Sequence, residues 1–267
     1  MSQEFTLVDR IICAAAQAWK NDGEVLATGI GVVPRLAASL CMKTINTDLM
    51  MTDSEAWLLS EPVPLTTGPM DNLPREGWMG FTRIFDNVWS GKRHAMVGPT
   101  QIDHYGQANI SMIGDDYNKP KVQMLGARGF PGNSISHANS FFVPNHSKSV
   151  FVSKDEVDMV ASIGYNAKRL PRGYSVDDVQ IRFIFTNLCV MDFGGKNHQL
   201  RLLSLHPGVT VEQVQEATGF AIEVPATVGV TADPTPEQIA LLNHFDPKTS
   251  EPKRWVNPAA FCALPNP

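Results

Sequence analysis

The 267-residue sequence lacks a basic block, a dense set of cysteines and any apolar run long enough to cross a membrane. Its 22 lysines and arginines are outnumbered by 27 aspartates and glutamates, which gives a net charge of −5. This acidic balance argues against a nucleic-acid partner and gives no attraction to an anionic membrane surface. The sequence therefore predicts a protein that binds neither nucleic acid nor membrane.

The four cysteines are widely separated, and no two of them form a CxxC motif. This pattern is typical of reduced thiols in a cytoplasmic protein rather than of a disulfide framework. The first ten residues, MSQEFTLVDR, place charges ahead of any apolar run, so they predict no signal peptide. The seven histidines form neither an HExxH motif nor a His/Cys pair at ligand spacing, and no metal site is predicted.

Helix and strand patterns alternate at the start of the chain. Thr6 is predicted to cap a helix that ends at Asn21–Gly23, and a strand over 24–28 follows. A tight glycine turn then leads into a second helix that begins near Pro34, before a strand over 47–52. This order is that of βαβ units, so we expect an α/β fold with a mostly parallel sheet covered by helices.

Short β-prone runs, broken by Gly, Asn and Pro, fill the middle of the chain. Tyr105-Gly106 between two of them predicts a hairpin. Two stronger strands are expected further on, over 179–185 and 200–205. The short runs are 94–97, 101–103, 109–113, 122–125 and 149–152.

Two capped helices are predicted near the end of the chain. Thr210 and Thr235 each begin a capping box, with a glutamine three residues later. The sequence after Asn243 is interrupted by prolines and shows little periodicity. We expect one domain over 1–247 and a tail over 248–267 that packs on a partner or on the domain.

Three segments are candidates for binding or chemistry. Gly29-Ile-Gly31 follows a strand and opens a helix, as a dinucleotide loop does, but Pro34 replaces the third glycine and a plain turn is favoured. Glycines at every third position over 126–132 follow a predicted strand, and their N–H groups can converge on a carbonyl oxygen or a phosphate. A turn without a ligand is the alternative there. The third segment, Asp53-Ser54-Glu55, is either a site at a strand end or a helix cap.

The segment 97–109, VGPTQIDHYGQAN, resembles the G-x-x-Q-x-D-x-x-G-N-x-N hairpin of class I CoA-transferase β subunits, with Gln107 in place of the first Asn. The glycine-rich segment 126–134 follows at the spacing of that family. The end of the chain, from LHPGVTVE at Leu205 to the VP at 224–225, resembles the family's HPG-V-T…TGF…VP ending. Within the family, the chain most resembles the β subunit of a hydrolase that opens steroid rings carried as CoA thioesters.

The resemblance implies the class I CoA-transferase fold, which is of the NagB/RpiA/CoA-transferase-like type. It also implies an α2β2 assembly with a CoA-transferase-like α subunit, and a CoA thioester as substrate, so that no separate cofactor is needed. The implied reaction is a retro-Claisen-like hydrolysis of a ring C–C bond in cholesterol or steroid catabolism. The substrate- or CoA-binding residues that it implies are Gly126, Arg128, Gly129, Phe130, Gly132, Asn133 and Ser134.

One departure from the family concerns the catalytic acid. In the transferases a glutamate followed by Ser-Gly attacks the thioester, and this position falls on Asp53, with Ser54 and Glu55 after it. Aspartate is one methylene shorter and Glu55 is bulkier than glycine, which argues against covalent transfer because the reacting atoms must lie within about 3–3.5 Å. Asp53 and Glu55 stay candidate catalytic residues, Glu61 ranks lower, and the resemblance implies that the main glutamate comes from the α subunit.

Three other functions stay open from the sequence. The chain can be an authentic CoA-transferase β subunit of the glutaconate or 3-oxoacid type, or a non-catalytic subunit that completes its partner's site. A sugar-phosphate isomerase or sensor would need a lysine beside a phosphate, and only Lys119 and Lys121 are candidates for it. Gln101, Asp103 and Asn109 are expected to brace the hairpin rather than to do chemistry.

Overall fold

The computed structural model contains two compact units. Unit 1 joins the residues up to Met96 to those from Ala232 onward, and unit 2 runs from Val97 to Thr231. The prediction of one domain over 1–247 stays a prediction. The structure describes residues 5–53, 55–65 and 72–246, so the predicted tail over 248–267 lies outside the described residues.

Unit 1 begins with the helix, strand and helix that the sequence predicts. α1 (Leu7–Ala16) follows Thr6, whose side chain accepts a hydrogen bond from the N–H of Asp9, and the 3-10 helix η1 (Gln17–Trp19) continues it. β1 (Leu26–Gly29) and α2 (Val32–Thr44) come next. A β-carbon at Gly29 would lie 2.5 Å from the Arg35 nitrogen, so the glycine lets α2 pack closely on β1.

The next part of unit 1 is a small antiparallel sheet. The strand predicted over 47–52 is shorter in the structure, where β2 covers only Met51–Thr52, although Met50 also forms a parallel bridge with Leu26. The sequence did not predict the other two strands, nor the helix α3 (Gly80–Trp89) that follows them. The three strands are β2 (Met51–Thr52), β3 (Trp57–Leu59) and β4 (Arg75–Trp78), in that order across the sheet.

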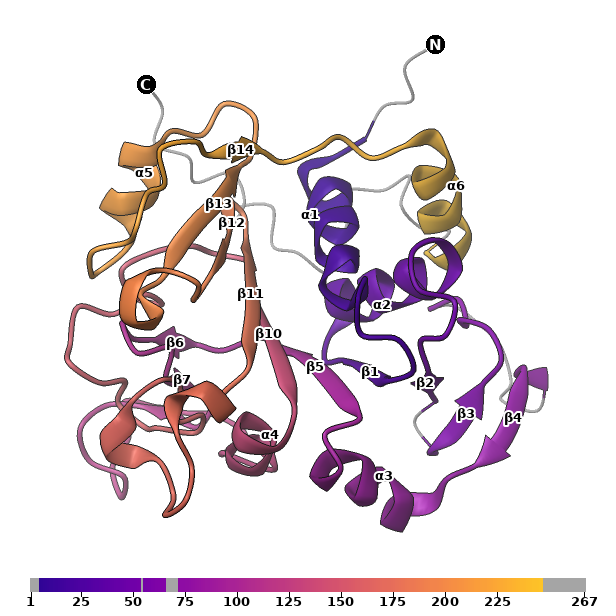
Figure 1. Ribbon diagram of the computed structural model, residues 1–267, viewed down its shortest axis with the longest axis horizontal. Helices are drawn as coiled ribbons and strands as arrows, with labels where there is room; N and C mark the ends of the chain where they lie inside the picture. The colour runs from indigo at the N-terminus through magenta and orange to yellow at the C-terminus, as the bar shows by residue number, and fades with distance from the viewer. Residues whose placement is uncertain (1–4, 54, 66–71, 247–267) are drawn as a thin grey trace. The chain divides into compact units, whose positions relative to one another are not determined.

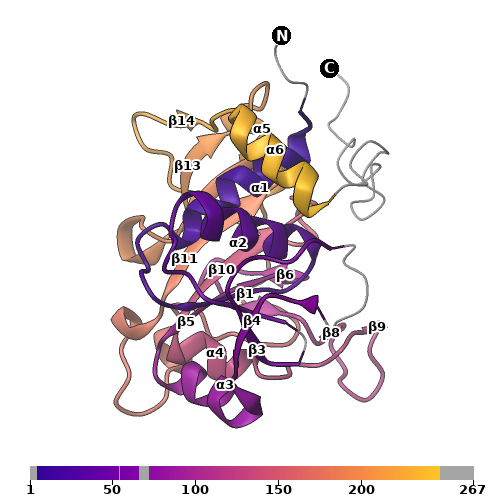
Figure 2. The ribbon, with the colours of Figure 1, turned by 90° about the vertical axis from the view of Figure 1, so that its right-hand side faces the viewer.

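Helices lie on both sides of the parallel pair formed by β1 and β5 (Arg93–Val97). α1, α2 and α6 (Pro236–Phe245) lie on one side, and α3 lies on the other (Figures 1 and 2). α6 begins at the capping box of Thr235, as predicted. The core between the helices and the strands is apolar, and its largest fully buried side chains include Ile11, Ile12, Trp19, Leu26, Leu40 and Met96.

Unit 2 is built on a five-stranded array with mixed strand directions. Along the array, the strand pairs β10–β11 and β13–β14 are parallel, and the strand pairs β11–β12 and β12–β13 between them are antiparallel. The capping box predicted at Thr210 is present and begins α5 (Val211–Ala217). The strands are β10 (Ala138–Val143), β11 (Ile181–Thr186), β12 (Cys189–Asp192), β13 (Arg201–Leu205) and β14 (Gly229–Val230).

The hairpin predicted at Tyr105-Gly106 is confirmed. Gly106 has a φ of +74°, and the two strands beside it pair antiparallel. The strand predicted over 149–152 is wrong, because in that segment the structure has only an isolated bridge between Phe151 and Ile102. The remaining elements are β6 (Gln101–Ile102), β7 (Ala108–Asn109), β8 (Met112–Ile113), β9 (Val122–Gln123), α4 (Phe130–Ser136), η3 (Ala167–Arg169), η4 (Val176–Asp178) and η5 (Lys196–His198).

The predicted fold class is confirmed, since the strands include the parallel pairs β1–β5, β10–β11 and β13–β14 within a mixed sheet that has helices against it. None of the helices formed by the described residues has the length and apolar character that a membrane crossing requires.

Candidate active site

The carboxylate of Asp53 accepts hydrogen bonds from four N–H donors at the turn between β2 and β3. Its Oδ1 accepts from the backbone N–H groups of Glu55 and Trp57, at 2.8 and 3.0 Å. Its Oδ2 accepts from Nε and Nη2 of Arg75, at 2.9 and 2.7 Å. The Asp53 side chain is only 4% exposed. The helix cap expected as an alternative for this residue is in fact a turn cap, because β3 and not a helix follows.

The pKa of Asp53 is lowered by its partners. Burial alone would raise it, but the hydrogen bonds from Trp57, Arg75 and Glu55, together with the charge of Arg75, outweigh burial. A second cation faces the same carboxylate: burial lowers the pKa of Arg35 in α2, and the charge of Asp53 acts to raise it. Asp53 is therefore a fully paired anion.

Glu55 shares the Arg75 guanidinium with Asp53 but faces solvent. Its Oε2 lies 2.9 Å from Nη2 of Arg75, and its side chain is 58% exposed. The Glu55 carbonyl accepts a hydrogen bond from Nε1 of Trp78 at 3.1 Å, and the N–H of Met79 donates to the Ala56 carbonyl. The structure thus brings both predicted acids together on Arg75 and ties their turn to the end of β4. Glu61 lies apart from them, paired with Lys43.

The glycine-rich segment in unit 2 is a shorter loop than predicted. Gly126 and Arg128 have φ values of +86° and +54°, whereas Gly129 has a φ of −84°. The helix α4 begins at Phe130 and includes Gly132. The expectation that the glycine-rich segment 126–134 is a loop throughout is therefore wrong for residues 130–134, because these residues are part of the helix α4.

The predicted binding residues of this segment divide into exposed and buried groups. Phe130 is buried and packs edge-on to Phe141, with ring centroids 6.1 Å apart. Asn133 and Ser134 are also buried: the Asn133 carbonyl accepts from Asn139, and the Ser134 hydroxyl donates to the Pro131 carbonyl. In contrast, Arg128 and Gly129 are exposed. The residues that can meet a ligand on the surface are therefore those before α4.

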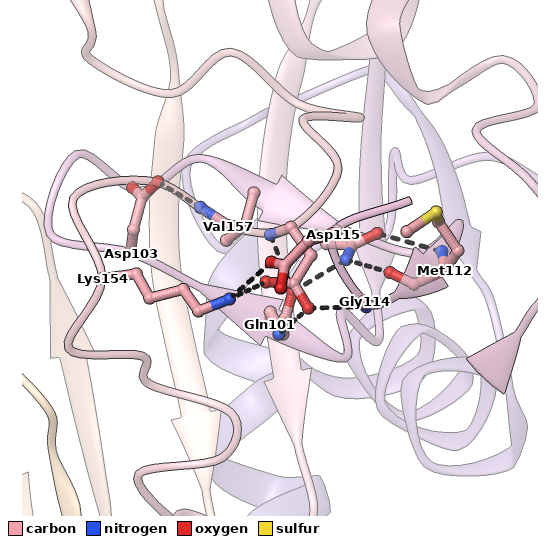
Figure 3. Close-up of polar contacts among 9 residues, drawn as sticks. Gln101, Asp103, Met112, Gly114, Asp115, Lys154 and Val157 are labelled. Atoms are coloured by element: carbon pink, nitrogen blue, oxygen red, sulfur yellow. Dashed lines mark hydrogen bonds and ion pairs between the residues drawn. The ribbon is translucent and has the colours of Figure 1, made fainter. Parts of the chain in front are cut away.

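Gln101 and Asp103 of the hairpin motif lie in the polar network of Figure 3, together with residues of the segments 112–115 and 154–157. Oε1 of Gln101 accepts from Asn109 and from the N–H of Asp158, at 2.8 and 3.1 Å. Asp158 in turn accepts from Gln101, from the N–H of Gly114 and from Lys154. These contacts join the β6–β7 hairpin, and the antiparallel pair of β8 and β9 through Gly114, to the segment around Asp158. This is the bracing role expected for Gln101 and Asn109.

Asp103 occupies the motif's acid position and is fully buried. It accepts hydrogen bonds from the backbone N–H groups of Tyr105, Gln107 and Val157 and from the Gln107 side chain. Burial raises the pKa of Asp103 to about 7, against the lowering effect of these backbone bonds and with the nearby charge of Glu156 adding to the rise. Gln107, the departure from the motif, is itself buried and bonded, so glutamine fits this position.

A cavity of about 380 Å³ lies beside this hairpin in unit 2; of its lining residues only Tyr105 was noted from the sequence, and only as part of the hairpin turn. The rings of Tyr165 and His198 stack at 4.3 Å on its lining, and His198 has a φ of +58°. Gly194 and Gly195 come just before Lys196–His198, and such a glycine pair is the signal in the sequence that could have indicated an unusual backbone conformation here. Within the described ranges, no group of three His, Cys, Asp or Glu side chains is placed to hold a metal ion.

Comparison with known proteins identifies the family. No family model matches the chain. The chain is 38% identical over 247 residues, 92% of its length and 94% of the relative's, to the cholesterol ring-cleaving hydrolase IpdB subunit of Rhodococcus jostii. It is 32% identical over 247 residues, 89% of its length and 92% of the relative's, to the B subunit of the 3-oxoadipate CoA-transferase of Pseudomonas knackmussii.

A solved structure shows the same relationship. The crystal structure of Rhodococcus jostii IpdAB superimposes with a TM-score of 0.85 at 37% identity, over 95% of this chain and 99% of that chain. The fold and these identities define a B subunit of the CoA-transferase family, and the chain belongs to this family. Within it, the chain is similar to the IpdB subunits.

We expect the Asp53→Asn substitution to destabilise the chain by about 1–3 kcal/mol, because it leaves the Arg75 guanidinium facing an amide N–H₂ group while the Oδ1 contacts persist. Urea denaturation at neutral pH measures this change. Since the pKa of Asp53 lies below its ordinary 3.8, the difference should disappear as the pH falls below that value.

The matched control for Asp53→Asn is Glu55→Gln. It removes the exposed partner of the same guanidinium, and we expect a change of less than about 0.5 kcal/mol. Equal effects of the two substitutions would contradict the assigned difference between the buried and the exposed carboxylate.

We also expect Asp103 to make stability depend on pH. The folded state holds this proton up to a pKa of about 7, whereas the unfolded value is 3.8, so the contribution is largest below 3.8 and is lost as the pH rises to 7. The free energies of unfolding of the native chain and of Asp103→Asn, measured from about pH 5 to 8, should therefore converge or cross as the native chain loses stability. A difference that stays constant over this range would refute the elevated pKa.

Proposed function

We propose that this chain is the B subunit of a heteromeric hydrolase that opens a ring of a steroid-derived CoA thioester. The observation that carries the proposal is its 38% identity, over 92% of its length, to a cholesterol ring-cleaving hydrolase IpdB subunit. The IpdAB structure supports an A subunit as its partner. This A subunit is proposed to be CoA-transferase-like and to form an α2β2 assembly with this chain.

The proposed reaction is a retro-Claisen-like hydrolysis of a cyclic ketone next to a second carbonyl group. A carboxylate takes a proton from water, and the water oxygen bonds to the ring carbonyl carbon. The ring C–C bond then breaks, its electron pair moves to the carbon beside the second carbonyl, and that carbon takes up a proton. One water is consumed and one carboxylate is formed. N–H donors must hold the charge on the attacked oxygen.

In this proposal Asp53 has a positioning role. A carboxylate with four N–H partners and a lowered pKa is a weak base, and it would have to leave the Arg75 guanidinium to attack a carbonyl carbon. Glu55 is the acid that this turn presents to solvent. The base that activates water is therefore assigned to the A subunit, and Glu55 is assigned a supporting position at the site.

The segment before α4 is proposed to bind the CoA part of the substrate. Arg128 is exposed and is held in a left-handed backbone conformation, and a guanidinium matches the geometry of a phosphate group. Gly126 and Gly129 place backbone N–H groups without β-carbons on either side of it. The buried residues Phe130, Asn133 and Ser134 fix the segment to unit 2, for example through the contact of Phe130 with Phe141 and the bond from Asn139 to the Asn133 carbonyl.

The direct test of the function is to co-express this chain with its A subunit and to supply a bicyclic oxo-acid CoA thioester. We expect a product heavier by one water, with the CoA thioester intact, and no turnover by this chain alone. Mass spectrometry of the product measures both results.

Transfer of CoA to an added free acid, without uptake of water, would instead identify a CoA-transferase. The 32% identity to the B subunit of a 3-oxoadipate CoA-transferase makes this the second candidate. Turnover by the A subunit without this chain would contradict both functions.

For the CoA-binding segment, we expect Arg128→Ala to raise KM for the CoA thioester by about 10-fold or more with kcat little changed, because a charged hydrogen bond contributes about 1.5–3 kcal/mol. Arg172→Ala removes another exposed arginine of unit 2 and serves as the control. If Arg128→Ala and Arg172→Ala show the same KM, Arg128 does not contact the substrate.

A further inference from the structure

Four large aromatic side chains of unit 1 form an exposed row, which we call the aromatic ridge: Trp78, Phe81, Phe85 and Trp89. Their exposed fractions are 62%, 69%, 59% and 67%. Phe81, Phe85 and Trp89 are spaced four residues apart on α3 and therefore share one face of the helix. Apolar residues at this spacing ordinarily mark the buried face of a helix. Here that face is uncovered, within the part of the chain that the structure describes.

Contacts with the rest of unit 1 hold parts of the aromatic ridge in place. Val88 and Gly80 of α3 are buried, so the helix itself is packed against its unit. Trp78 donates from Nε1 to the Glu55 carbonyl, and its ring lies 6.5 Å from that of Trp57. Because these contacts fix Trp78 before binding, its side chain loses little conformational freedom on association, which favours tight contact.

The exposed apolar area of the ridge is large enough for the central part of a protein–protein interface. Four aromatic side chains of about 150–250 Å² each, exposed by about two thirds, present about 500 Å² of aromatic surface. This area lies in the upper half of the range of about 300–600 Å² that is found for the largest apolar patch on a typical monomer. It would also fill more than half of the roughly 800 Å² that each partner contributes to a standard interface.

We propose that the aromatic ridge is the surface on which the A subunit docks, an inference that rests on the proposed function. The ridge begins at Trp78, which is bonded to the turn that holds Asp53 and Glu55. If the A subunit supplies the base for this site, it must cover that turn, and the surface continuous with the turn is the ridge.

Charge around the ridge distinguishes the A subunit from a second copy of this chain. Glu76 and Asp86 are exposed near it, as is Glu55 beside Arg75, against the exposed cations Arg83 of α3 and Lys92 just after this helix. A symmetric contact between two copies would bring like charges together, which is unfavourable. The expected occupant is therefore an apolar groove of the A subunit with basic side chains at its rim.

The test compares two double variants of this chain, each co-expressed with the A subunit. Phe81→Ser with Phe85→Ser removes the centre of the ridge, and we expect the Kd for the A subunit to rise by at least about 100-fold, since buried aromatic anchors dominate interface energies. The control, Tyr117→Ser with Val230→Ser, removes side chains of unit 2 that are 66% and 73% exposed, and it should leave the Kd unchanged. Sedimentation measures the Kd, and thermal unfolding of each variant alone checks that it folds.

Three results would overturn the inference. One is an unchanged Kd in the ridge variant, and another is loss of self-association alone, which would identify a second copy as the occupant. The third comes from the native chain and needs no variant to fold: hydrogen exchange over 78–91 should slow in the complex with the A subunit, and unchanged exchange would contradict docking there. Hydrolysis by the native complex is measured separately, so the proposed function can fail while the docking surface stands, or the reverse.

Discussion

The bidentate pair between Arg75 and Asp53 constrains the part of the molecule on which its proposed function depends. Asp53 directly follows β2, Arg75 begins β4, and β3 lies between them, so one ion pair joins the two outer strands of the small sheet. The remaining oxygen of Asp53 closes the turn into β3 through two N–H groups. This pair is costly to break because the Asp53 side chain is only 4% exposed, so its charge would lose the guanidinium partner without gaining full solvation by water.

Two surfaces follow from this constraint. Glu55 is displayed to solvent at the tip of the turn, and the Trp78 indole is bonded to the Glu55 carbonyl, which places the start of the aromatic ridge. The chain thus presents an acid and an apolar surface side by side while its own most buried carboxylate in this turn is neutralised. This arrangement suits a protein that completes a site with a partner, and it fits poorly with an enzyme whose nucleophile is Asp53.

Local features were predictable from the sequence, and the site's geometry was not. The capping boxes at Thr6, Thr210 and Thr235 involve residues three apart, so a short pattern specifies them, and the order of motifs sufficed to indicate the family. Arg75 and Asp53 are separated by 22 residues, and no local pattern indicates that they pair.

Two helices escaped prediction for identifiable physical reasons. α3 has aromatic residues at helical spacing, but it begins at Gly80 without a side-chain cap, so no capping pattern marks its start in the sequence. α4 begins with Phe130-Pro131-Gly132, a sequence typical of a turn, and it forms because Phe130 packs in the core and Asn139 bonds to the Asn133 carbonyl. Tertiary packing outweighs low helix propensity there.

In the proposed reaction Asp53 takes no covalent part, and a single turnover of the assembled enzyme in water enriched in heavy oxygen tests this most directly. If a base on the A subunit activates water, the label enters the new carboxylate of the product, and the peptide that contains Asp53 stays unlabelled. If Asp53 attacks the carbonyl carbon, a mixed anhydride forms, and water can release it by attack on either of its two acyl carbons. Heavy oxygen in the Asp53 carboxylate, or a hydroxamate of Asp53 or of the product when hydroxylamine is present during the turnover, would contradict the account.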